Sequence, residues 1–196
     1  MTVDRSVDIQ LNDLKKIVLR MGSHVEHALE LAVQGLTKNQ PEKFRQVHEI
    51  EELINEAHVL LDNSCFLYLA KQGPVAKDLR LVLSLTKINT DLERMGDQTV
   101  NIAHTGKDFL ERSSIQWPVE IEEMAKLARQ MVRESLDSFV REDVEQAKKI
   151  LVMDDEVDSR KNIIFRRMIC RPLTWQPACQ ILPRPNVHDA IRKSAF

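Results

Sequence analysis

The chain has 196 residues, of which 43% are hydrophobic and 30% charged, with 5 glycines and 7 prolines. Its formal net charge is −2, and the 28 basic and 30 acidic side chains are mixed along the sequence. This composition is typical of a helical globular protein. The sequence has no extended basic region that could neutralise the phosphates of a nucleic acid, so we do not expect nucleic acid as a partner.

Two further properties bear on where the protein resides. Residues 1–10 are polar and charged, and no uninterrupted apolar run approaches the ~18 residues that a membrane span needs. The three cysteines are Cys65, Cys170 and Cys179, an odd number without C-x-x-C spacing, which fits a reducing compartment better than a disulfide framework. We therefore expect a cytoplasmic protein with no membrane insertion.

Apolar residues recurring every three or four positions predict three long helices in the first part of the chain, over residues 8–38, 41–71 and 76–111. The run Asn39-Gln40-Pro41 ends the first, and a proline suits the first turn of the next. Gln72-Gly73-Pro74 makes the second turn. These helices form the first predicted domain, residues 1–112.

The segment 113–118 is the predicted boundary, with Pro118 at the start of a helix. Two more helices are predicted over 119–140 and 143–169, in a second domain of residues 118–170. These two helices resemble a second copy of the first two, displaced by 103 residues. The matched pairs are Met21 and Met124, Leu36 and Phe139, Val47 and Ile150, Glu51 and Asp154, and Asn55 and Asp158. The sequence thus predicts an all-α fold of two tandem three-helix bundles.

The third predicted helix carries an acid face. Glu93, Asp97 and Asn101 lie at i, i+4 and i+8, which stacks them opposite an apolar stripe. Carboxylates one turn apart repel by a few tenths of a kcal/mol, so they need either free solvation or a cation. The simpler interpretation is a solvated helix face with basic residues nearby. His104 shares this face and is a weaker candidate ligand.

The run from Gln72 to Ala103, QGPVAKDLRLVLSLTKINTDLERMGDQTVNIA, closely resembles a signature helix of the PhoU family of phosphate-uptake regulators. The resemblance extends over about residues 1–169. It implies two pseudo-symmetric three-helix bundles, a homodimer, and negative regulation of phosphate uptake and of the phosphate-starvation response. The implied partners are the ATPase subunit of the Pst phosphate transporter and the phosphate-sensing histidine kinase.

The resemblance also implies metal ions, because some members of the family bind them through an acid-x-x-x-Asp motif. On this chain the motif corresponds to Glu93 and Asp97, with Glu51 and Asn55 in the same repeat. The second repeat supplies Asp154 and Asp158. Asn55 departs from the acidic pattern. Oxygen ligands favour iron, manganese or magnesium.

The last part of the chain departs further from the family. Four of the seven prolines lie between Arg171 and Phe196, and a helix interior does not tolerate that density. We interpret residues 171–196 as an irregular tail, produced by an altered reading frame after about Ile169 or by genuine divergence. The second bundle would then lack its regular third helix. Its two helices would leave an apolar groove, lined by Leu127, Met131, Leu136, Ile150 and Val157.

Enzymatic function has little support in the sequence. There is no glycine-rich phosphate loop, no nucleophile elbow and no H-E-x-x-H motif, so we predict a protein that is not an enzyme. Two alternatives stay open. One is a carboxylate-bridged metalloenzyme on a helical bundle, which the lack of suitably spaced histidines weighs against. The other is a plain helical adaptor without metal.

Overall fold

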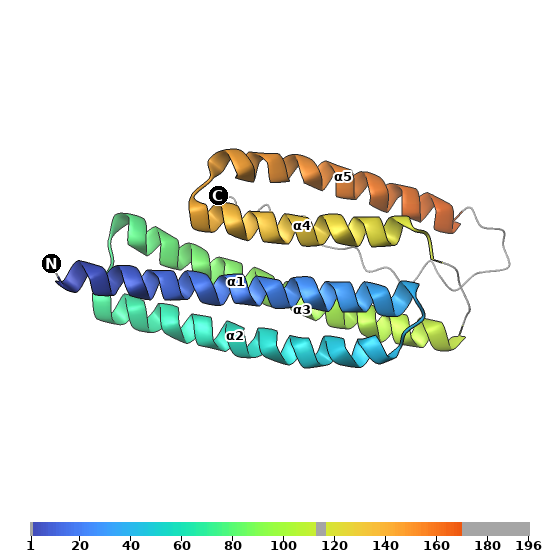
Figure 1. The fold of residues 1–196 in the computed structure, drawn as a ribbon, viewed down its shortest axis with the longest axis horizontal. Coiled ribbons are helices and arrows are strands. Elements are labelled where there is room, and N and C mark those ends of the chain that lie inside the picture. The colour runs from blue at the N-terminus through green and yellow to red at the C-terminus, as the bar shows by residue number, and fades with distance from the viewer. Residues whose placement is uncertain (1, 113–116, 170–196) are drawn as a thin grey trace.

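A computed structural model describes residues 2–112 and 117–169 of the chain, and those residues form five α-helices and no strand (Figure 1). The helices are α1 (Thr2–Thr37), α2 (Glu42–Gln72), α3 (Ala76–Arg112), α4 (Glu120–Arg141) and α5 (Val144–Ile169). The predicted all-α class is confirmed. No helix in these ranges combines the length and the hydropathy that crossing a membrane requires.

The helix ends agree with the sequence-based prediction to within one residue, apart from the start of α1. That helix begins at Thr2 and not near Asp8, since neither proline nor glycine precedes Gly22 to interrupt it. Gly73 ends α2 in a left-handed conformation with φ of 52°, and its N–H donates to the Leu69 carbonyl. Glu142 adopts a similar φ of 58° after α4, which is unfavourable for a residue with a Cβ.

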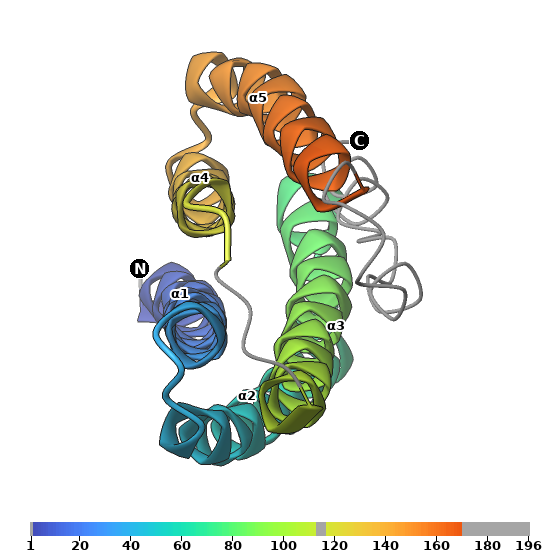
Figure 2. The same ribbon diagram turned by 90° about the vertical axis from the view of Figure 1, so that its right-hand side faces the viewer.

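The first three helices form one bundle around a continuous core (Figure 2). Phe44 of α2 lies at one end of it, only 3% exposed, between two glycines. A Cβ on Gly35 of α1 would lie 2.6 Å from Phe44 Cε1, and one on Gly106 of α3 would lie 3.0 Å from Phe44 Cζ. The two glycines therefore let three helices close around an aromatic ring. The fully buried side chains of this bundle include Val18, Met21, Val25, Val47, Ile54, Leu61, Val82 and Leu85.

The helix α4 lies along α1, and α5 lies against α4 on the side away from α1 (Figure 2). Val132 and Leu136 of α4 belong to the same buried cluster as the core of the first bundle. A Cβ on Gly22 of α1 would lie 2.1 Å from Leu136 Cδ1. The second repeat is thus joined to the first by shared apolar packing, not only by the connection between α3 and α4.

This packing bears on the predicted apolar groove. Met131, Leu136 and Ile150 are buried, at 2%, 7% and 3% exposure, whereas Leu127 and Val157 are half-buried. The prediction of an open groove is therefore wrong for the first three residues. For Leu136 the reason is its contact with α1 beside Gly22, a surface that the prediction did not consider. The predicted tail, residues 171–196, lies outside the described residues.

Candidate functional site

The acid face predicted on the third helix lies on α3. Glu93 is half-buried, and both Asp97 and Asn101 are exposed. Their neighbours Leu92 and Gly96 are buried in the core, roughly 60–100° around the helix from Glu93. The face is therefore open to solvent along its length, with Glu93 at its inner edge.

The predicted partners on α2 also lie at the edge of the bundle. Glu51 is half-buried and Asn55 is exposed. The side-chain amide of Asn55 donates a hydrogen bond to Glu51 Oε1, one turn away. In this geometry the amide compensates part of the charge on the Glu51 carboxylate, which a second acid at position 55 could not do.

The register between α2 and α3 brings these two pairs to the same level of the bundle. Asn89 Nδ2 of α3 donates to the His58 carbonyl of α2 at 2.9 Å. One to two turns further along, a Cβ on Gly96 would lie 3.1 Å from Ile54 Cδ1. Since the helices are antiparallel, Glu51 and Asn55 lie within about one helical turn of the level of Asp97 and Glu93.

The remaining candidates lie elsewhere. His104 is exposed on α3, and its Nδ1 lies 3.9 Å from Asp108 Oδ2. Asp154 and Asp158 are half-buried on α5 of the second repeat, and Asp158 forms an ion pair with Lys161. Each repeat thus carries its own candidate oxygen ligands at positions i and i+4 of a helix.

All of these donors are oxygens, apart from His104, and they suit a hard cation chemically. Among residues 2–112 and 117–169, however, no three His, Cys, Asp or Glu side chains come close enough together to hold a metal ion. In this arrangement the carboxylates form pairs along single helices. A shared site on α2 and α3 would need side-chain rotation to bring the two pairs together.

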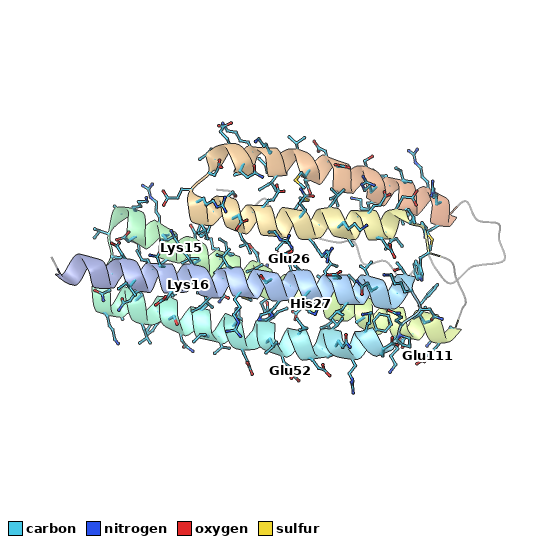
Figure 3. All side chains as sticks on the ribbon, in the orientation of Figure 1. Lys15, Lys16, Glu26, His27, Glu52 and Glu111 are labelled. Atoms are coloured by element: carbon cyan, nitrogen blue, oxygen red, sulfur yellow. The ribbon has the colours of Figure 1, made fainter. Side chains whose placement is uncertain are left out.

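The structure shows a second arrangement of charged residues, between α1 and α4. Glu26 is only 8% exposed and lies on the side of α1 that faces α4 (Figure 3). Its Oε2 accepts a hydrogen bond from Arg133 Nη2 at 2.5 Å, and this contact raises the pKa of Arg133 above its ordinary value. One turn along, Arg129 pairs with Glu30. Two acids on α1 therefore face two arginines on α4.

Two further polar contacts join the repeats. The Thr37 hydroxyl at the end of α1 donates to Glu122 of α4 at 2.7 Å. Lys77, near the start of α3, donates to Glu142 Oε2 at 2.8 Å, beside the turn between α4 and α5. The Lys77 ammonium lowers the pKa of Glu142 by hydrogen bonding and by charge. The contact between the repeats thus extends over most of the length of α4.

The sequence-based prediction did not include the contact between α1 and α4, because its partners are far apart in the sequence, by 107 positions for Glu26 and Arg133. The sequence nevertheless contained a pattern that could have indicated this contact. Glu26 and Glu30 lie at i and i+4 on one helix, and Arg129 and Arg133 have the same spacing on another. Two such pairs of opposite charge can face each other across antiparallel helices.

Comparison with known proteins supplies the family context. The model of the PhoU domain matches this chain twice, at residues 18–105 and 121–180. The starts of the two matches are 103 residues apart, which is the displacement found within the sequence. Among curated proteins, the chain is 31% identical to a phosphate-specific transport system accessory protein PhoU homolog of Pseudomonas putida, over 85% of this chain and 66% of that one. The corresponding protein of Escherichia coli K12 is 29% identical, over 82% and 66%.

Solved structures give the same result for the fold. The crystal structure of PhoU from Pseudomonas aeruginosa superposes with a TM-score of 0.78 at 29% identity, covering 96% of this chain and 90% of that one. The phosphate transport system regulatory protein PhoU from Streptococcus pneumoniae superposes with a TM-score of 0.76 at 22% identity, covering 96% and 89%. The chain spans about two thirds of the length of several of the curated relatives it matches.

Proposed function

The chain belongs to the PhoU family, and on that premise we propose that it is a regulator of phosphate transport and not an enzyme. The observation that carries the proposal is the tandem match of both repeats to the PhoU domain. In finer detail, the protein restrains phosphate uptake and the phosphate-starvation response from the cytoplasm. It does so by contacting the Pst transporter ATPase subunit and the phosphate-sensing histidine kinase, as a homodimer.

The mechanism that we propose is conformational and involves no bond-making step. A regulator of this kind binds one state of its partner more tightly than another and so shifts the partner's equilibrium. The long helices of the first bundle offer extended surfaces for such contacts. The polar contact between α1 and α4, centred on Glu26 and Arg133, is an element through which a change in one repeat could alter the other.

Metal binding is a further part of the proposal. Glu93 and Asp97 of α3, together with Glu51 and Asn55 of α2, would hold an iron, manganese or magnesium ion, and Asp154 and Asp158 would serve the second repeat. The oxygen chemistry of these donors and the common level of the α2 and α3 pairs support this assignment. A bound cation would neutralise the repulsion between neighbouring carboxylates.

The two alternatives make different demands. A carboxylate-bridged metalloenzyme typically combines its bridging acids with Glu-x-x-His motifs on the bundle helices, and the sequence contains no Glu-x-x-His. A plain helical adaptor needs no metal and no effect of phosphate status. The regulator is the better supported of the three, because it accounts for the match to the family over both repeats.

Gene deletion in the host tests the proposed function. Loss of the protein should derepress phosphate uptake and phosphatase synthesis when phosphate is plentiful. Re-expression of this chain in the deletion strain should restore repression, and the ATPase subunit should co-purify with it. Normal repression in the deletion strain would contradict the regulatory role, whereas repression without co-purification would contradict only the proposed partner.

A further inference from the structure

The solvent-facing side of α2 carries several large, exposed apolar side chains. The core side of this helix is packed in the first bundle, with Ile54, Leu61 and Cys65 buried. On the opposite side Phe66 is 70% exposed and Val59 is 57% exposed. Contiguous apolar surface of this kind marks sites of interaction.

These side chains follow the spacing of a helix–helix contact. We define the α2 seam as Val59, Asn63, Phe66 and Ala70, flanked on one edge by Leu60 and Leu67. The four seam positions are 4, 3 and 4 residues apart, which aligns them in one stripe along the helix. Leu60 and Leu67 are both at least half exposed, and Asn63 and Ala70 are exposed as well.

We propose that the α2 seam is the interface through which two copies of this chain associate, with their α2 helices antiparallel. In an antiparallel pair related by a two-fold axis, each large seam residue meets a small one. Phe66 packs against Asn63 of the partner copy, and Val59 packs against Ala70 of the partner copy. The flanking Leu60 then meets Leu67 of the partner copy. One surface is therefore complementary to itself in shape, as a two-fold dimer requires.

The charges at the ends of the seam follow the same symmetry. The exposed Glu52 and Glu56 lie towards the start of α2 and the exposed Lys71 lies at its end, and Glu52 is on the side of α2 away from α1 (Figure 3). In the antiparallel pair, Glu56 lies within one turn of Lys71 of the partner copy. A parallel pair would instead place acid against acid, so the charge pattern favours the antiparallel arrangement.

The polar residue in the middle of the seam adds specificity. Asn63 lies near the two-fold axis, where an amide can hydrogen-bond across the contact. A single polar residue in an apolar helix contact fixes register and orientation at some expense of stability. Because the proposed dimer of the regulator requires some interface, this inference rests on that part of the proposed function and deepens it.

The test is the oligomeric state of the full chain, measured by sedimentation over a range of concentrations. Phe66→Glu should weaken dimerisation by at least about tenfold, since it places a charge at the centre of an apolar contact. Phe165→Glu is the matched control, because Phe165 is 56% exposed on α5 and outside the seam. Circular dichroism should show that both variants keep their helix content.

A charge exchange tests the antiparallel geometry separately. Glu56→Lys and Lys71→Glu should each weaken the dimer, and the double variant should restore it, because the exchanged charges attract again. Wild-type protein that stays monomeric at high concentration would overturn the proposal, as would a dimer that is unaffected by Phe66→Glu. A monomer that still restores repression in the deletion strain would refute the interface alone. A seam-dependent dimer that fails to restore it would refute the regulatory function alone.

Discussion

Glu26 on α1 accepts a hydrogen bond from Arg133 on α4, with 2.5 Å between Oε2 and Nη2, across 107 positions of the sequence. The carboxylate is nearly buried, while the side chain of Arg133 is 69% exposed. Replacing the arginine would leave a carboxylate at the contact between the repeats without its charged partner, and such groups destabilise a fold.

The first prediction concerns this pair. Glu26→Ala and Arg133→Ala should each lower the stability of the chain, and the double variant should lose less than the sum of the two. The positive coupling should appear in a double-mutant cycle by denaturant unfolding. Lys148 and Glu145, an exposed pair within α5, serve as the control cycle and should show weaker coupling. If the losses in free energy of unfolding from Glu26→Ala and Arg133→Ala were strictly additive, the contact would not join the repeats.

The second prediction concerns Phe44 and the glycines around it. Gly35→Ala gains about 1 kcal/mol of helix propensity, but its Cβ would lie 2.6 Å from an atom of the Phe44 ring. Overpacking of this kind costs about 1–3 kcal/mol, so the net effect should be a loss of stability of up to about 2 kcal/mol.

The same substitution should behave differently once the ring is removed. In a Phe44→Leu background, Gly35→Ala should be neutral or stabilising, because the smaller side chain vacates the space. Thermal unfolding of the four proteins measures both effects. An equal loss in the two backgrounds would show that the ring does not limit the space at position 35.

The third prediction concerns pH. Burial, with the nearby Arg20 and His27, lowers the pKa of His24 from its ordinary value of 6.5. The folded chain therefore binds fewer protons at this site than the unfolded chain, and stability falls as the pH drops through 6.5 towards the lowered pKa. His24→Gln should remove this part of the pH dependence.

Unfolding measured between pH 7.5 and 5.5 tests this effect. The wild-type chain should lose more stability over that range than His24→Gln. His104→Gln is the comparison, since His104 is exposed beside Asp108. If His24→Gln and the wild type had parallel pH profiles, the environment of His24 would not shift its titration.

The fourth prediction concerns metal. Protein purified in air should carry iron, manganese or magnesium at the face formed by α2 and α3. The double variant Glu93→Ala, Asp97→Ala should lose that ion, because the remaining pair of Glu51 and Asn55 has only one charged donor. Elemental analysis measures the content, and Glu111→Ala, at the far end of α3, is the control. Equal metal content in wild type and double variant would exclude the site.

The sequence predicted the helices almost completely, because their signals are local. Apolar residues at helical spacing define each segment, and Pro41, Gly73 and Pro118 mark the breaks between them. The internal repeat was also visible, since two copies displaced by 103 residues preserve core positions such as Val47 and Ile150, both buried. These features depend on neighbours along the chain, which a sequence displays directly.

The pairing of acids within each helix was predictable for the same reason. Glu93 and Asp97 share a face of α3 because of their spacing alone. The position of Glu93 and Asp97 along the bundle, relative to Glu51 and Asn55, was not predictable, because it depends on the register between two helices. That register is decided by contacts such as Asn89 with the His58 carbonyl, whose partners are 31 positions apart.

The position of α4 was decided by the tertiary structure alone. A helix with an apolar stripe packs on whichever surface fits it best, and its own sequence does not identify that surface. Here the absence of a side chain at Gly22 leaves room for Leu136, and Glu26 and Glu30 match the charges of Arg133 and Arg129. The sequence by itself determined which segments are helical and which faces are apolar. The tertiary structure decided which faces meet, because shape and charge must fit between residues that are far apart in the sequence.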